Sequence, residues 1–268
     1  MTYRAPVADI AFALRHAARF AAAREAGVYD LDDETLSAVL EEAGKFATDV
    51  IAPLNRVGDL HGTPFKDGVV TMPPGWKEAY ASWAAAGWNG LAGPEAFGGQ
   101  GLPAAVNAAC VEMWNAASMA FGIGPVLTMA AINALAQHGS DALKATYLAK
   151  LVSGEWMGTM QLTEPQAGSD VGALRTKAER AADGSYRITG SKIFITYGEH
   201  DLTDNIIHFV LARLRVFFSG WRRPQPRGRH DRRSRPCVTE CNPSVPELTR
   251  ISRQHLSMPR NSGNAALS

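Results

Sequence analysis

Residues 158–213 place the strongest constraint on the fold, because strand-like runs there alternate with a small-residue loop and a turn. The first run ends at Thr163-Glu164-Pro165, since proline cannot donate to a sheet ladder and biases its predecessor toward extended geometry. Ala167-Gly168-Ser169-Asp170 then supplies a loop in which backbone amides and a hydroxyl can lie bare against a ligand. The stretch therefore predicts a sheet that carries a ligand-binding loop.

Two further runs follow a turn at Asp183-Gly184, and both have strand composition. Residues 186–189 and 193–196 are rich in β-branched and aromatic side chains, which favours strands. On a strand, Phe194 and Thr196 would share a face because they lie two residues apart. An apolar contact from Phe194 and a hydrogen bond from Thr196 suit a flat ring edged with heteroatoms.

These residues resemble the flavin-binding middle domain of acyl-CoA dehydrogenases. That family's signature is close to (V/L)TEPxAGSD followed by GxKx(W/F)ITxG, which here correspond to residues 162–170 and 190–198. Two spaced motifs in the right order, with a strand pair between them, make the match specific. The glycine-rich residues 87–102 resemble a segment of the family's N-terminal helical domain. The first residues of the chain and residues 197–202 resemble a larger subclass that includes 3-methylmercaptopropionyl-CoA dehydrogenase.

The preceding part of the chain has helical periodicity. Asp32 or Asp33 can cap a helix whose apolar stripe runs to Val50 and which Pro53 ends. The other expected elements are a helix over residues 8 to about 25, a loop or hairpin over 61–71, a helix opening at Pro74, two buried helices over 103–120 and 125–137, and a last helix from Ser140 or Asp141 through Leu151. Trp76, Tyr80 and Trp83 lie on one side of the Pro74 helix and are interpreted as core.

The fold class is therefore predicted to be α+β. An all-α helical domain over residues 1–155 precedes a partial, antiparallel flavin-binding sheet or barrel domain over 156–213. A tail over 214–268 follows, and it does not continue the family pattern.

Charge separates this tail from the rest of the chain. Residues 1–213 carry 16 Lys and Arg against 23 Asp and Glu, whereas residues 214–268 carry 11 against 3, and all eleven cations are arginine. Six prolines in those 55 residues and the lack of apolar periodicity argue against a packed domain. The abrupt change inside a strand-like element favours a frameshifted or misread end, with the tail largely disordered.

Metal and membrane signals are weak in this sequence. The three cysteines, Cys110, Cys237 and Cys241, give neither a disulfide framework nor a zinc-ligand spacing. The first twenty residues lack a long uncharged apolar run, so neither a signal peptide nor a membrane span is indicated, and a cytoplasmic location is expected.

The resemblance implies α,β-desaturation of an acyl-CoA thioester, with hydride passing to N5 of FAD. Transferred residue by residue, Thr163 would bind the pyrimidine edge of the flavin, Thr196 would lie near N5, and Ser169 would also touch substrate. The whole implied cofactor-binding set is Met160, Gln161, Leu162, Thr163, Gly168, Ser169, Phe194, Ile195 and Thr196. The family's partners would be an electron-transfer flavoprotein and further copies of the same subunit.

No catalytic residue is assigned within this chain. The family's base is a glutamate of the C-terminal helical bundle, and neither Glu164 nor Glu199 matches its position. Glu164 precedes a proline in the flavin loop, so we expect it to be structural. Because a general base contributes roughly 10²–10⁴-fold, we expect little dehydrogenase activity and weak FAD retention from the chain alone.

Two other functions remain open at this point. A non-catalytic relative could keep the helices and sheet as a flavin- or acyl-CoA-binding scaffold. The arginine-rich tail could be a nucleic-acid-binding arm, although residues 1–213 show no basic patch and no nucleic-acid partner is expected.

Overall fold

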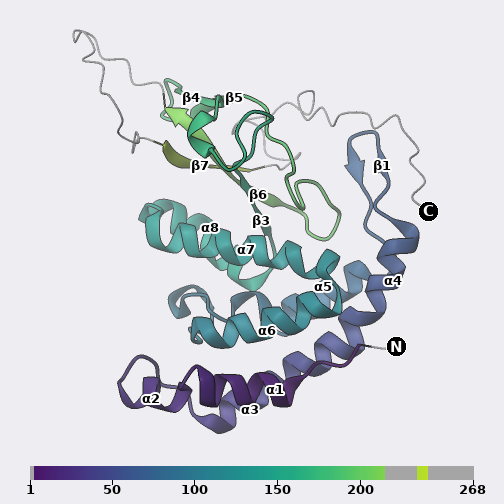
Figure 1. The fold of residues 1–268 in the computed structure, drawn as a ribbon. Helices are drawn as coiled ribbons and strands as arrows, with labels where there is room; N and C mark the ends of the chain where they lie inside the picture. Colours follow the sequence, from purple (N-terminus) through teal and green to yellow (C-terminus); the bar gives the residue numbers. More distant parts are fainter. Residues whose placement is uncertain (1–2, 215–233, 241–268) are drawn as a thin grey trace. The chain divides into compact units, whose positions relative to one another are not determined.

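The computed structural model describes residues 3–214 and 234–240 (Figure 1). Its chain contacts define two compact units. The helical unit comprises the residues up to Thr159 together with Thr196–Ile207, and the sheet unit comprises Met160–Ile195 together with the residues from His208 onward.

Among its described residues, the helical unit holds eight α-helices. They are α1 (Val7–Phe12), α2 (Phe20–Glu25), α3 (Asp33–Phe46), α4 (Ala52–His61), α5 (Trp76–Ala85), α6 (Ala104–Ala117), α7 (Met119–His138) and α8 (Asp141–Ser153). Wider π-helical turns, Ala13–Ala17 and Ala47–Ile51, follow α1 and α3, and short 3-10 turns span Trp88–Gly90 and Glu95–Phe97. Within this unit α7 lies between α6 and α8, and α6 in turn packs on α3 (Figure 1).

An aromatic cluster forms the centre of the helical core. The rings of Trp83 and Trp114 meet edge to face with centroids 4.3 Å apart, and Phe121 and Trp88 extend the cluster. Trp114 Nε1 donates to the Ala43 carbonyl at 3.2 Å, which satisfies the polar end of a buried indole. Burying one large apolar side chain of this kind stabilises a fold by roughly 1.5–3 kcal/mol. Trp76, Tyr80 and Trp83 are all buried, so their interpretation as core is confirmed.

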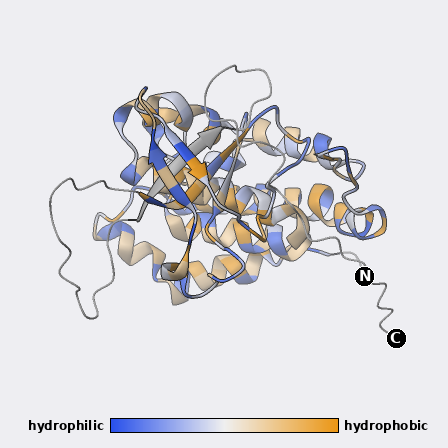
Figure 2. Ribbon diagram, turned by 90° about the horizontal axis from the view of Figure 1, so that it is seen from above, coloured by the Kyte–Doolittle hydropathy of each residue, from blue (hydrophilic) through white to orange (hydrophobic). Residues whose placement is uncertain are grey.

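Polar and apolar residues alternate along the helices, as expected of elements that are half buried (Figure 2). Among the described residues, α7 is long and apolar enough to cross a membrane by length and composition alone. Of its most apolar 18-residue window, 44% is buried inside the structure, and one such helix is weak evidence for a membrane span.

Capping follows the predicted chemistry at two helices. Asp32 caps α3, its carboxylate accepting from the Thr35 amide at 2.6 Å, and Ser140 caps α8 by accepting from the Leu143 amide. The hairpin expected within residues 61–71 is present as β1 (Phe65–Lys66) and β2 (Val69–Val70).

Three helix boundaries differ from prediction. The first predicted helix is divided, because Arg19 adopts a left-handed conformation with φ of 52° between the π turn and α2. Pro53 does not end the helical run: a π turn precedes it and it lies in the first turn of α4, where a missing amide hydrogen costs little. Pro125 does not begin a helix either, because α7 starts at Met119 and passes through it.

The predicted antiparallel sheet is wrong in one respect: the observed sheet is mixed, because it contains a parallel strand pair. Its strands are β3 (Met157–Gln161), β4 (Lys177–Arg180), β5 (Tyr186–Thr189), β6 (Ile206–Leu214) and β7 (Ser234–Glu240). Their order is β3-β6-β4-β5, and β7 also pairs with β6. β4 and β5 form an antiparallel hairpin around the predicted turn at Asp183-Gly184, whereas β4 and β6 run parallel. The long connection from β5 to β6 permits this parallel pairing.

Of the tail expected to be disordered, the structure describes Leu214, which ends β6, and the β7 residues, which form a strand. The expectation for residues 215–233 and 241–268 lies outside the described residues.

Candidate functional site

The predicted site residues lie around the end of β3 and in the segment after β5. Met160 and Gln161 end β3, and Leu162 and Thr163 follow directly. Gly168 and Ser169 are exposed in the loop before the 3-10 turn Val171–Ala173. Of the nine residues, only Thr196 belongs to the helical unit; the other eight belong to the sheet unit.

Two hydrogen bonds to backbone carbonyls join the two motifs within the sheet unit. The Ile193 amide donates to the Thr163 carbonyl at 3.0 Å, and Lys192 Nζ donates to the Leu162 carbonyl at 2.9 Å. Residues 162–163 and 192–193 are therefore neighbours in space, although they lie about thirty positions apart in the chain.

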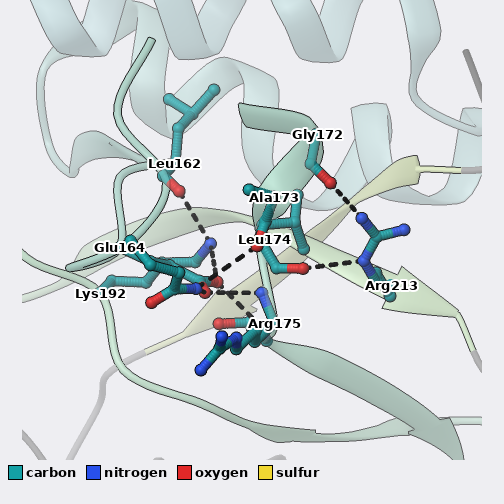
Figure 3. A network of polar contacts seen from close by, with 10 residues as sticks. Leu162, Glu164, Gly172, Ala173, Leu174, Arg175, Lys192 and Arg213 are labelled. Carbon is teal, nitrogen blue, oxygen red and sulfur yellow. Dashed lines mark hydrogen bonds and ion pairs between the residues drawn. The ribbon is translucent and has the colours of Figure 1, made fainter. Parts of the chain in front are cut away.

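Glu164 is the centre of the polar network that stabilises this junction (Figure 3). Its Oε1 accepts from Lys192 Nζ at 2.9 Å and from the Thr176 amide at 3.0 Å. Its Oε2 accepts from the Arg175 amide and from Gln166 Nε2, both at 2.6 Å. The Glu164 and Lys192 side chains are only 2% and 5% exposed, so this ion pair is buried.

The network determines the charge of Glu164. Burial alone would raise the pKa of this carboxyl, but hydrogen bonds from Thr176, Arg175 and Lys192 outweigh burial and lower the pKa to about 2. A carboxylate with so low a pKa and four donors around it is a poor proton acceptor. The expected structural role of Glu164 therefore agrees with its geometry.

Arg213, from β6, stabilises the other end of the same loop (Figure 3). Its Nε donates to the Leu174 carbonyl at 2.8 Å, and its guanidinium also contacts the Gly172 carbonyl. The Arg213 amide donates to the Thr176 carbonyl at 2.8 Å. The loop between the AGSD motif and β4 is thus attached to β6 by backbone and side chain together.

Two hydroxyls and one stretch of backbone in the predicted flavin site remain available to a ligand. Among the described residues, no side-chain hydrogen bond involves the Thr163 or Ser169 hydroxyl. A Cβ added at Gly168 would meet nothing within 4 Å. Free hydroxyls beside an open backbone fit a planar ligand with heteroatoms at its edge.

Residues 193–196 do not form the predicted strand. Phe194 has a left-handed φ of 58°, which a continuous strand does not permit, and its side chain is 87% exposed. The predicted shared face of Phe194 and Thr196 is therefore wrong as strand geometry. Contact with a ligand would account for the exposed Phe194 side chain and for its left-handed backbone.

Gly190 is the first residue of the second motif, and the backbone of Thr176 lies too close to it for a larger residue. A Cβ at this position would lie 2.7 Å from Thr176 Cα, and a main-chain atom cannot move aside as a flexible side chain does. We expect Gly190→Ala to lower the free energy of unfolding by about 1–3 kcal/mol, as measured by urea denaturation. Gly168→Ala is the matched stability control, and equal losses in the two variants would contradict this account.

Lys192 is the lysine of the GxKx motif, and the sequence patterns alone assign it no role. The sequence did contain a signal for the ion pair: a lysine between two strand-like runs in one motif, and an acidic residue just before a proline in the other. Nothing in the periodicity identified Glu164 as its partner, because that contact depends on the tertiary fold.

Comparison with known proteins agrees with this geometry. Residues 33–155 match the acyl-CoA dehydrogenase N-terminal domain, and residues 159–220 match the acyl-CoA dehydrogenase middle domain. The chain is 50% identical over 216 residues to 3-methylmercaptopropionyl-CoA dehydrogenase of Ruegeria pomeroyi, a match that covers 80% of this chain and 36% of that protein. The chain thus spans about a third of the length of this relative.

Solved structures show the same fold. Butyryl-CoA dehydrogenase of Megasphaera elsdenii superposes with a TM-score of 0.56 at 29% identity, over 68% of this chain and 45% of that one. An FAD complex of PigA superposes with a TM-score of 0.54 at 26% identity, over 69% and 45% of the two chains. The sequence motifs, the helical unit followed by a partial sheet, and both domain matches show that this chain belongs to the acyl-CoA dehydrogenase family.

Proposed function

We propose that this chain is the flavin-binding part of an FAD-dependent acyl-CoA dehydrogenase, an oxidoreductase that desaturates an acyl-CoA thioester between its α and β carbons. The observation that carries the proposal is the junction of the two motifs, where the Glu164–Lys192 pair holds residues 162–163 beside residues 192–193. The hydroxyls of Thr163 and Ser169 remain available there. The FAD complex of PigA supports the choice of cofactor.

Each residue of the proposed set has a binding or positioning role. Thr163 binds the pyrimidine edge of the flavin, Thr196 lies near N5, and Ser169 contacts both flavin and acyl-CoA. Apolar contact with the ring comes from Phe194 and Ile195. The rest of the set is Met160, Gln161, Leu162 and Gly168. When bound, the flavin accepts the β-hydrogen of the acyl group as hydride.

Proton abstraction from the α carbon is assigned to no residue of this chain. Glu164 is excluded as a base because four donors hold it ionised, with a pKa of about 2. In this proposal the chain binds and orients flavin and thioester, and the base belongs to a part of the family protein that this sequence does not match.

Substrate subclass, partners and location are proposed by analogy with the family. The identity to the Ruegeria pomeroyi protein supports a place in the subclass that contains 3-methylmercaptopropionyl-CoA dehydrogenase. An electron-transfer flavoprotein is the proposed electron acceptor, a homo-oligomer the proposed assembly, and the cytoplasm the proposed location.

Equilibrium titration of the full chain with FAD tests the proposal. We expect saturable quenching of flavin fluorescence, loss of flavin on gel filtration, and no bleaching with acyl-CoA. Thr163→Val removes one hydrogen bond and should weaken FAD binding about five- to tenfold.

Thr146→Val on α8 is the matched control, because Thr146 is exposed and outside the sheet unit. Equal affinity in Thr163→Val and wild type would contradict the assigned site. Flavin that stays bound through gel filtration and bleaches with acyl-CoA would contradict the expected lack of turnover. Flavin binding without turnover, even after joining to a relative's remaining domains, would favour a non-catalytic scaffold.

A further inference from the structure

Tyr197, the residue after Thr196, packs against α7 at Gly124, next to Pro125, a site that we call the seat. The sequence motifs do not explain this contact. Its hydroxyl donates to the Ala120 carbonyl at 2.7 Å and lies 3.4 Å from the Phe121 carbonyl. Both carbonyls belong to the first turn of α7, within the same compact unit as Tyr197.

Two residues of α7 make this seat. Pro125 has no amide hydrogen, so the Phe121 carbonyl lacks its usual helical donor and is free to face the phenol. Gly124 leaves space for the ring, because a Cβ there would lie 2.6 Å from Tyr197 Cε1. A proline and a glycine inside one helix each weaken it, so their adjacency under the Tyr197 ring indicates a seat shaped for that ring.

The backbone of Tyr197 needs such support. Its φ of 55° is left-handed, a conformation uncommon for residues with a Cβ and most often adopted by asparagine or aspartate. Burial raises the pKa of the Tyr197 phenol, which keeps the hydroxyl protonated and able to donate.

A second attachment follows a few residues later in the same segment. Asp201 Oδ1 accepts from the Met72 amide at 2.9 Å, and Asp201 Oδ2 pairs with Lys77 at 3.0 Å. Within the helical unit, Tyr197 and Asp201 therefore both hold the segment after Thr196, and the Tyr197 contact is the one adjacent to Thr196.

We propose that Tyr197 is a positioning residue, which seats on Gly124 and Pro125 of α7 and thereby sets where the Thr196 hydroxyl lies. The flavin part of this inference rests on the proposed function, because Thr196 is the hydroxyl assigned to the region near N5. The attachment itself does not depend on flavin.

A double-mutant cycle in the full chain tests the seat. Alanine in place of an interior helical glycine ordinarily stabilises a helix. We expect Gly124→Ala to lower the urea midpoint when Tyr197 is present and to raise it in the Tyr197→Asn background. A shift of the same sign in both backgrounds would overturn the seat.

Tyr197→Phe tests the positioning role, because it keeps the ring and removes only the donor. We expect amide hydrogen exchange at residues 196–198 to accelerate about tenfold or more, and the dissociation constant for FAD to rise about tenfold. Tyr80→Phe is the matched control: the Tyr80 hydroxyl likewise donates to a backbone carbonyl of the helical unit, that of Gly154 at 3.0 Å. That variant should leave both readouts at their wild-type values.

The outcomes separate the two proposals. If wild-type chain shows no FAD binding, the proposed function fails, while the exchange rates and the double-mutant cycle still decide the seat. Unchanged exchange at residues 196–198 in Tyr197→Phe overturns the attachment. Faster exchange with unchanged FAD affinity overturns the positioning of Thr196.

Discussion

Replacing Lys192 by methionine should lower the free energy of unfolding by about 3–5 kcal/mol, because it leaves Glu164 buried without its cation. The two side chains are 5% and 2% exposed, so water cannot take the place of the ammonium group. Methionine keeps most of the side chain's length and apolar contacts. The loss therefore reports the charge and the hydrogen bonds to Leu162 and Glu164 rather than a cavity.

Urea denaturation measures this loss, and hydrogen exchange at the Arg175 and Thr176 amides locates it. Both amides donate to Glu164, so their protection should fall with the pair. Lys45→Met is the matched control: Lys45 pairs with Glu42, both are 62% exposed, and such a surface pair contributes about 0–1 kcal/mol. If both lysine variants lost the same stability, the buried pair would not be what holds the motifs together.

Adding Glu164→Gln to Lys192→Met separates the pair from its surroundings. With the charge gone from both positions, the double variant should be more stable than the sum of the single losses predicts. A coupling of about 0.5–3 kcal/mol is typical of residues in one network. Additive losses would mean that Glu164 and Lys192 act independently.

The elements predicted well were those determined by local chemistry. Asp32 and Ser140 cap helices because their side chains reach backbone amides three residues on, and Asp183-Gly184 turns because glycine accepts a φ of 89°. The errors arose where tertiary contacts overrule local preference. Pro125 stays inside α7, and Phe194 leaves the strand region although its neighbours favour strands.

The same distinction between local chemistry and tertiary contacts applies to the candidate site. Motif spacing gave the residues that we propose to surround a flavin, and the proline after Glu164 indicated a structural role for that carboxylate. It could not show that Lys192 is the cation opposite Glu164, or that Gly190 lies against Thr176. Such contacts join residues far apart in the sequence, so the pattern of polar and apolar residues cannot predict them.

The second large effect we expect is loss of stability in mild acid, caused by His208 of β6. Burial lowers the pKa of His208 to about 4, against an ordinary value of 6.5. Between these values the unfolded chain binds a proton that the folded chain does not, so stability falls as pH falls from 6.5 toward 4. The difference corresponds to roughly 3 kcal/mol lost across the window.

Glu164 continues the loss at lower pH. Its folded pKa of about 2 lies below the ordinary value of 4.5, so its stabilising contribution is complete above pH 4.5 and disappears as pH falls toward 2. Urea denaturation at a series of pH values should therefore show two successive declines. His208→Gln should flatten the upper decline only, and Glu164→Gln the lower one only.

His138→Gln, at the exposed end of α7, is the control for the upper window. The comparison depends on the slope of stability against pH rather than on its absolute value, so a general loss from replacing a buried histidine does not obscure it. An unchanged slope between pH 6.5 and 4 in His208→Gln would show that the decline comes from other groups. A flattened slope would assign the upper decline to the buried His208 of β6, just as the lower decline is assigned to Glu164.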